Sequence, residues 1–529
     1  MTQKSKSRNA DFMFIARKGD TTTLGAEGPV KLKNLKNPRG AAPSILTPAG
    51  RVPKLYLKGS RTMQFERRLD RKLIFSIIAA GILSFTGVVI ETAMNVTFPS
   101  LMKEFSVSTA LVQWITTGYL LVLAVVIPLS GYLKERFLMK RLFLTASGLF
   151  ILGTLLGAWS PDFLLLLLGR ILQGAGTGIA LPLMFNIIMD QAPLNRLGFM
   201  VGAAMLVCAL APAVGPSIGG YIVSLWGWRM IFWAVLPLLL LSFVLGGLSV
   251  RQASDLRRPS FDAMGLLYLA ISFTCLLLGC TELGHGRITF TAALLFAGFL
   301  LALFFFWNRE RNLMDQGKRP LLNIRALKNR PFVLGALGLS LLQFLCLALG
   351  FLLPCFSQIV TGENAFAAGC ILLPGCLLGA LFAPLSGRIY DRFGARRPVL
   401  LGSALLILSM VLFNAALPFA STGILTVCYL FFAAGQGMSV GNILTYSLSV
   451  LDRSMKPDGN AICNTAQQLS GAVGTAVAAA IVSAAQMDEP GDFARATALG
   501  TAEALLVLLI LSLLQFLALF LSFRKEGRL

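Results

Sequence analysis

Glu91 and Arg170 are the residues whose positions most directly suggest chemistry. Glu91 lies near the end of an otherwise apolar stretch, 73–98, and Arg170 lies within a second apolar stretch, 163–188. Charged side chains inside a bilayer are costly and usually mark the path of an ion, proton or substrate. Two other interpretations stay open for Glu91: the side chain reaches water from a helix end, or a partner keeps it neutral.

The two charges are expected at similar depth. If successive stretches cross the membrane in alternating directions, Glu91 and Arg170 both lie in the outer half of the bilayer. Burial favours the neutral form of Glu91 and a nearby Arg170 favours the charged form, a competition that suits a proton carrier. Asn95, one turn further on, is placed to hydrogen-bond either form, although a role in helix packing explains it equally well.

The composition provides the elements that hold these residues. The chain is 56% hydrophobic and only 13% charged, as expected for a membrane protein, and a spanning helix needs about 20 apolar residues. Fourteen stretches qualify: 73–97, 110–132, 141–159, 163–188, 198–223, 229–249, 262–282, 288–307, 332–358, 366–387, 398–418, 423–449, 461–485 and 503–523.

The net charge of +22 follows the predicted topology. With the N-terminus inside, nearly all Lys and Arg fall in the tails or in cytoplasmic loops, and Lys103, Arg287 and Arg495 fall outside. This is the positive-inside rule, and it predicts a multi-pass cell (inner) membrane protein with both termini in the cytoplasm. The same distribution argues against nucleic acid as a partner.

Residues 1–72 form a polar, basic segment that we expect to be a disordered cytoplasmic tail. It could bind the anionic inner leaflet. Alternatively, residues 1–62 are dispensable and Met63 is the true start.

Other chemistries find little support in the sequence. The nine cysteines form no CxxC pair, and His285 is the only histidine, so we expect no metal site and no cofactor. No Gly-rich phosphate loop ending in Lys-Ser/Thr is present, which disfavours ATP-driven pumping. We therefore predict a protein that is not an enzyme.

Two loops repeat one layout: a Gly, an acid four residues later, an Arg, a Phe and a basic cluster, at 131–141 and at 387–397. Such a repeat implies two related halves, here 73–250 and 331–529, with 251–330 as two inserted helices and a basic linker. Acid and Arg at helix ends can form a latch that holds one conformation; positive charge for topology alone is the alternative. The candidate latch residues are Gly131, Glu135, Arg136, Gly387, Asp391, Arg392, Gly394 and Arg396.

These loops resemble the signature of the major facilitator superfamily, and further motifs narrow the resemblance. Segment 170–176, with Gln173 and Gly174, is similar to the family's intramembrane arginine motif. Segment 211–220 resembles the antiporter motif of proton-driven exporters, with Ala211 in place of the usual Gly. Its candidate functional residues are Pro212, Gly215, Pro216, Gly219 and Gly220.

Segments 91–99, 226–232 and 319–325 are similar to the fourteen-helix drug:proton antiporters (EmrB/QacA type), most of all to the lincomycin-resistance-like branch. The first loop departs from the pattern, with Glu135 for Asp and Leu138 for Gly, so its latch is expected to be weaker.

The resemblance implies an all-α polytopic membrane protein with the major facilitator fold: two six-helix halves plus two inserted helices. It implies proton-coupled efflux of amphiphilic drugs or toxic small molecules by alternating access, with Glu91, Arg170 and Asn95 in proton coupling. The two prolines of 211–220 favour a bend that seals the path, with ordinary close packing as the alternative. A proton-coupled symporter, an exporter of an endogenous metabolite or lipid, and a membrane scaffold or sensor are the competing functions.

Overall fold

The computed structural model describes residues 70–193, 196–253, 256, 261–285, 289–318, 320–452, 455–489 and 491–524. These residues all belong to one compact unit, Phe65–Leu529. Apart from its last three residues, 70–72, the predicted basic tail lies outside the described residues.

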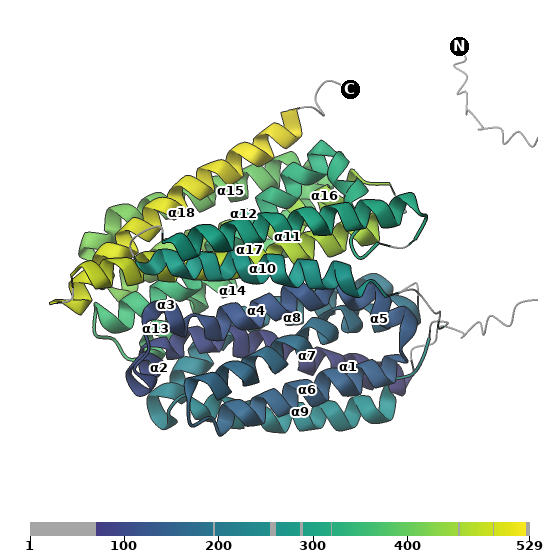
Figure 1. Cartoon of the computed structure of the whole chain (residues 1–529), viewed down its shortest axis with the longest axis horizontal. Coiled ribbons are helices and arrows are strands. Elements are labelled where there is room, and N and C mark those ends of the chain that lie inside the picture. Colours follow the sequence, from purple (N-terminus) through teal and green to yellow (C-terminus); the bar gives the residue numbers. More distant parts are fainter. Residues whose placement is uncertain are drawn as a thin grey trace, which may run out of the picture. The chain divides into compact units, whose positions relative to one another are not determined.

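Every regular element among the described residues is a helix, and the helices follow one another with short connections (Figure 1). Capping side chains begin several of them: Asp70 accepts a hydrogen bond from Leu73 N, and Asp162 accepts one from Leu165 N. The elements are α1 (Arg71–Ala93), η1 (Met94–Thr97), α2 (Phe98–Phe105), α3 (Thr109–Val112), α4 (Trp114–Val126), η2 (Ile127–Leu129), α5 (Ser130–Arg136), α6 (Met139–Ala158), α7 (Phe163–Gln191), α8 (Leu197–Trp226), α9 (Arg229–Ser249), α10 (Ala263–Glu282), η3 (Leu283–His285), α11 (Phe290–Asp315), η4 (Ile324–Lys328), α12 (Arg330–Ile359), α13 (Ala365–Cys370), α14 (Leu373–Phe393), α15 (Arg396–Ala416), η5 (Leu417–Phe419), α16 (Thr422–Ser449), α17 (Lys456–Asp488) and α18 (Phe493–Arg524).

In the described part of the chain, helices long and apolar enough to cross a membrane correspond to thirteen of the fourteen predicted stretches. Within the described residues, 13 helical segments are long and apolar enough to cross a membrane, and α8 contributes a shorter apolar segment, Leu210–Trp226. Because α8 as a whole runs from Leu197 to Trp226, it fills the place of the predicted stretch 198–223. The prediction of an all-α polytopic membrane protein is confirmed.

The last helix is longer than its apolar stretch. We expected a span at 503–523, but α18 begins at Phe493. Asp492 caps the start through the Arg495 amide, and Thr497 and Thr501 are buried and donate to backbone carbonyls of their own helix. Hydropathy alone misses this segment because its polar groups are satisfied within the helix. Glu503 therefore lies well inside α18 rather than at its start.

The long helices pack as two groups. Helices α1, α4, α6, α7, α8 and α9 contact one another, as do α12, α14, α15, α16, α17 and α18. In Figure 1 the first group runs from purple through blue to teal, and the second runs from green to yellow. Helices α10 and α11 pair with each other, and α10 also contacts α4 and α17. The exact boundaries 73–250, 251–330 and 331–529 stay predictions.

The two ends of the bundle differ in charge. We call the end with the α5–α6, α9–α10, α11–α12 and α14–α15 connections the basic end. The opposite, distal end carries the connections α2–α3, α6–α7 and α17–α18. Among the described Lys and Arg residues, Lys103, Arg229 and Arg495 lie toward the distal end, Arg170 lies inside the bundle, and the others lie at the basic end.

The two groups meet at the distal end. Gln358 on α12 donates to the Val96 carbonyl at 3.0 Å, and Thr109 donates to Gln486 on α17 at 2.7 Å. The rings of Phe98 and Phe351 pack with centroids 5.7 Å apart.

Candidate functional site

Glu91 lies just before a break in the first spanning segment, where α1 ends and the 3-10 turn η1 begins. Its side chain is buried, with 7% of the residue exposed. No hydrogen bond and no ion pair within 4 Å involves its carboxylate among the described residues. A buried carboxylate without such partners is costly when charged, so this site is suited to taking up a proton.

Arg170 on α7 is fully buried and held from several directions. Its Nε donates to the Ile115 carbonyl at 3.0 Å, and its Nη1 donates to Gln173 Oε1 at 2.8 Å. The guanidinium lies 4.4 Å from the ring centroid of Tyr119. Nη2 has no hydrogen-bond partner within the described structure, so one donor of this fixed cation stays free.

Gln173 extends this arrangement to α6, since its Nε2 donates to Thr154 Oγ1 at 2.9 Å. Gly174 permits close contact with α4, because a β-carbon there would lie 2.6 Å from the Tyr119 carbonyl oxygen. The two residues of the arginine motif thus position Arg170 between α4, α6 and α7.

The structure brings Glu91 and Arg170 near each other without joining them. Their charges interact through the interior, but the pair is not within ion-pair distance. Tyr119 contacts both helices that hold these charges. Its ring stacks against the Arg170 guanidinium of α7, and its hydroxyl donates at 3.2 Å to the carbonyl of Gly87 on α1, one turn before Glu91. A small movement of α1 against α7 would therefore change the interaction between the two charges.

Asn95 is buried in η1 and turns away from the acid. Its Oδ1 accepts from Thr116 Oγ1 on α4 at 2.8 Å, and its Nδ2 lies 3.5 Å from where a β-carbon on Gly350 of α12 would be. In this conformation Asn95 bonds to α4 at the break in the first span, and no hydrogen bond joins it to Glu91 in the part of the chain described.

The antiporter motif lies against the helix that carries Glu91. A β-carbon on Gly215 would meet Thr92 Oγ1 and, at 2.9 Å, the Val89 carbonyl; one on Gly219 would lie 2.7 Å from the Ala93 β-carbon. On the other side of α8, a β-carbon on Gly220 would lie 3.0 Å from Phe366 Cα. The motif glycines therefore place α8 directly between α1 and α13.

Pro212 and Pro216 do not interrupt α8, which is assigned as one continuous helix. The proposed bend at these prolines stays a prediction. Residues of neighbouring helices lie close to backbone carbonyls of the motif. Cys376 Sγ lies 4.0 Å from the Pro212 carbonyl oxygen, and a β-carbon on Gly369 would meet the Pro216 carbonyl oxygen. Prolines are tolerated in spanning helices where neighbouring helices pack this closely.

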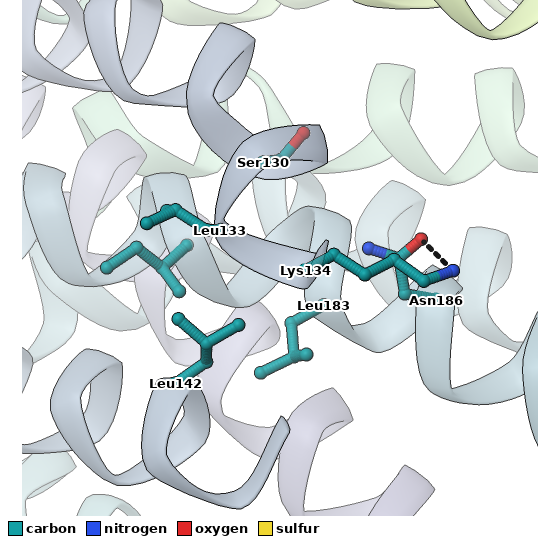
Figure 2. Close-up of a pocket in the computed structure, with 7 residues that line it drawn as sticks. Ser130, Leu133, Lys134, Leu142, Leu183 and Asn186 are labelled. Carbon is teal, nitrogen blue, oxygen red and sulfur yellow. Dashed lines mark hydrogen bonds between the residues drawn. The ribbon is translucent and has the colours of Figure 1, made fainter. Parts of the chain in front are cut away.

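The first candidate latch lies in α5 at the basic end, where an unexpected residue makes the ion pair. Lys134 Nζ lies 2.8 Å from Asp190 Oδ2 at the end of α7, and it also donates to Asn186 at 3.5 Å (Figure 2). Gly131, Glu135 and Arg136 belong to the same short helix. The adjacent cavity measures only about 10 Å³, room for about one water molecule, so it is a packing defect rather than a substrate site.

The second candidate latch spans the junction of α14 and α15. Gly387, Asp391 and Arg392 lie in α14, and Arg396 is the first residue of α15. Gly394, the residue after the end of α14, adopts φ +78°, a positive φ that favours glycine. A β-carbon on Gly387 would meet no described atom within 4 Å, so close approach of helices does not explain this glycine.

Sequence reasoning missed Tyr119 and Lys134. In the sequence, Lys134 is one of several basic residues in its loop, and Tyr119 is an aromatic residue in an apolar stretch. Neither position therefore predicts the contact with Asp190 or with Arg170 that the structure shows. The position of Asp190 at the end of α7, which lies at the same end of the bundle as α5, was the available clue to this ion pair.

One residue of the second helix group, Cys346, interacts with Glu91 inside the bundle. Cys346 on α12 is near enough for electrostatic interaction with Glu91, and it accepts from Gln436 Nε2 of α16 at 3.0 Å. Both side chains are partly exposed. The Glu91 carboxylate therefore lies within electrostatic reach of Cys346, which is itself hydrogen-bonded to Gln436.

A larger cavity of about 570 Å³ opens at the distal end between α2, α3, α12, α17 and α18. Its lining mixes apolar and polar side chains, including Met102, Lys103, Thr109, Gln486 and Phe493. Cavities of this size hold small organic molecules.

No group of three or more His, Cys, Asp or Glu residues that could hold a metal ion occurs among the described residues.

A multi-pass bundle of two helix groups, with a buried acid and a buried arginine between its helices, defines a membrane transporter. The family model described as Major Facilitator Superfamily matches residues 77–475. The chain belongs to this superfamily and is a transporter of small molecules, not an enzyme.

Among curated proteins, the Lincomycin resistance protein LmrB of Bacillus subtilis is 33% identical over 419 residues, covering 79% of this chain and 86% of that protein. The Multidrug resistance protein B homolog of Mycobacterium tuberculosis is 30% identical over 454 residues, with 83% and 80% covered.

Among solved structures, a bacterial homologue of the human lysosomal transporter Spinster, in an inward-facing and unoccupied conformation, aligns with a TM-score of 0.64. The sequence identity is 16%, and the alignment covers 86% of this chain and 98% of that one. At this identity the likeness concerns the fold.

Proposed function

We propose that this protein is a proton-coupled exporter of amphiphilic drugs or other toxic small molecules in the cell (inner) membrane. Relatives named for lincomycin resistance and multidrug resistance, which align over most of the chain, support the export of drugs. The observation that carries the proposal is Glu91, whose buried carboxylate lies near a fixed arginine and has neither a hydrogen bond nor an ion pair with any of the described residues.

We place the basic end of the bundle, and both termini, in the cytoplasm. Lys and Arg are enriched in cytoplasmic loops of membrane proteins, and the described cations gather at this end. The basic tail would then lie beside the anionic inner leaflet, where each nearby Lys or Arg contributes about 1 kcal/mol of attraction. The distal end, with its cavity beside Lys103 and Gln486, would face outward and serve as the exit path.

The proton site uses Glu91 as carrier and Arg170 as a competing charge. When Glu91 is exposed to the outside it takes up a proton, which lowers the cost of its burial as the distal end closes. When α1 moves toward Arg170, the positive charge favours release of the proton on the cytoplasmic side. The glycines Gly215 and Gly219 give α1 a smooth surface for this movement.

Substrate is proposed to bind between the two helix groups, opposite Glu91, in contact with Cys346 and Gln436. Substrate binding from the cytoplasm then accompanies proton release, and substrate leaves outward as the next proton binds. Asn95 and the candidate latches at 131–136 and 387–396 would stabilise the closed states at their respective ends. One proton moving through about 100 mV supplies roughly 2.3 kcal/mol, enough for a concentration ratio of about fifty for a neutral substrate.

The decisive experiment is Glu91→Gln, assayed with a panel of cytotoxic amphiphiles in inverted vesicles. The variant should be produced at normal levels and should still exchange bound substrate down a gradient, but it should lose uptake driven by a pH gradient. Glu503→Gln is the matched control, because this carboxylate is exposed on the surface of α18. Unchanged proton-driven uptake by Glu91→Gln would overturn the assignment of the proton site.

A further inference from the structure

Two buried carboxyl groups lie beside Gly265 at the basic end of the α10–α11 pair. Asp262 precedes α10 and its side chain is 8% exposed. Glu310 lies near the end of α11 and is fully buried. A β-carbon on Gly265 would meet both Asp262 Oδ2 and, at 3.1 Å, Glu310 Oε1, so the two oxygens approach the same point. Glu91 and Arg170 play no part in this cluster.

Each carboxyl group has one oxygen engaged and one oxygen free. Arg309 lies 3.0 Å from Asp262 Oδ1 through Nη2 and 3.1 Å from it through Nε. Glu310 Oε2 accepts from the Leu322 amide at 3.1 Å. Asp262 Oδ2 and Glu310 Oε1 are buried without a hydrogen-bond partner in the described structure. The unpartnered atoms are therefore the two oxygens that lie beside Gly265.

Two neighbouring carboxylates without solvent cannot both stay charged at modest cost, because each charge opposes the other. The negative charge of Asp262 disfavours a negative charge on Glu310. One proton between them removes one charge and gives both free oxygens a hydrogen-bond partner, the arrangement that carboxyl pairs use when they share a proton. A metal ion suits the cluster poorly, since Arg309 already supplies a positive charge to Asp262.

We propose that Asp262 and Glu310 form a proton-binding site, distinct from Glu91, in which the two carboxyl groups share one proton. Arg309 bonds to Oδ1 of Asp262, so the proton is shared between the remaining oxygen, Asp262 Oδ2, and Glu310 Oε1. The edge of the site at Arg309, whose side chain is 43% exposed, gives the proton access to water at the basic end.

The neighbouring elements define what this proton controls. Arg309 on α11 and Asp262 before α10 are the charged groups that act on Glu310. The linker before α12 contributes the amide of Leu322, and its Asn323 donates to Asp458 on α17 at 3.1 Å. Through the hydrogen bond to Leu322, Glu310 on α11 thus binds the linker, and the linker in turn contacts α17 through Asn323. Loss of the proton forces a second negative charge into the site and weakens this connection.

The test is hydrogen exchange of the linker peptide containing Leu322, measured by mass spectrometry on the full-length protein in lipid nanodiscs between about pH 6 and pH 8.5. After correction for intrinsic exchange, protection of the wild-type linker should fall about tenfold as the pH rises, because the folded site holds a proton that the opened site releases. Protection that stays constant over this range would overturn the proposal.

Substitutions separate the shared proton from simple packing. Glu310→Gln provides an amide that donates to Asp262 and an oxygen that still accepts from Leu322, so high protection should persist at every pH. Glu310→Ala removes both contacts and should lower protection about tenfold at every pH.

Glu282→Gln, at the other end of α10, is the control and should keep the wild-type pH dependence. A pH dependence that survives in Glu310→Gln would show that another group titrates. The same measurements in a Glu91→Gln background should be unchanged, which keeps this site independent of the proposed transport mechanism.

Discussion

Replacing Arg170 by Lys tests whether the geometry of this residue matters beyond its charge. The guanidinium makes two hydrogen bonds in different directions, to the Ile115 carbonyl and to Gln173 Oε1, and its face covers Tyr119. A Lys ammonium keeps the charge but is a compact donor group without a planar fork. It would retain one of these hydrogen bonds and leave the other buried acceptor without a partner.

The expected loss follows from these contacts. A buried hydrogen bond to a charged group contributes roughly 1.5–3 kcal/mol, and an acceptor left unsatisfied costs a further 1–3 kcal/mol. We therefore expect Arg170→Lys to lower the free energy of unfolding by about 3 kcal/mol, a factor of about 150 in the equilibrium. Proton-driven export should fall as well, because the charge is no longer fixed relative to Glu91.

Arg229→Lys is the matched control. Arg229 also covers an aromatic ring, that of Trp228 at 4.2 Å, and pairs with Glu104 at 2.6 Å, but its side chain is 37% exposed. Exposed ion pairs contribute about 0.5 kcal/mol, so this variant should be close to wild type. Unfolding of both purified variants in mixed micelles gives the comparison. Equal stability of the two variants would refute the reasoning that hydrogen-bond geometry holds Arg170.

Further predictions concern helix packing and the distal contact. Gly174→Ala would place a β-carbon 2.6 Å from the Tyr119 carbonyl, and it should cost about 1–3 kcal/mol in unfolding measurements. Gly148→Ala, whose β-carbon would meet nothing within 4 Å, should be neutral or slightly stabilising; equal losses would contradict the packing argument. Gln486→Ala removes the 2.7 Å hydrogen bond from Thr109. At about 1 kcal/mol, this should raise about fivefold the rate at which an impermeant maleimide labels an Ala110→Cys variant, whose side chain lines the same cavity and leaves Thr109 intact, and an unchanged rate would mean that this contact does not hold the distal end closed.

The sequence determined the fold class because the length of each apolar stretch, the distribution of charge and the repeated loop are local properties. Each can be read from one stretch of chain without knowing which helices pack together. It also singled out Glu91, since a carboxylate in an apolar stretch is conspicuous without knowledge of its neighbours. Helix limits were less accurate: α18 extends to Phe493 because its polar groups are satisfied internally, which hydropathy does not register.

Only the tertiary structure decided which side chains meet. Tyr119 under Arg170, Lys134 against Asp190, and Asn95 bonded to Thr116 rather than to Glu91 all join helices whose relative rotation no local pattern specifies. The sequence by itself determined that buried charges exist and roughly how deep they lie, because depth follows from position along a helix. Their partners depend on the packing of several helices at once, and that packing exists only in the folded bundle.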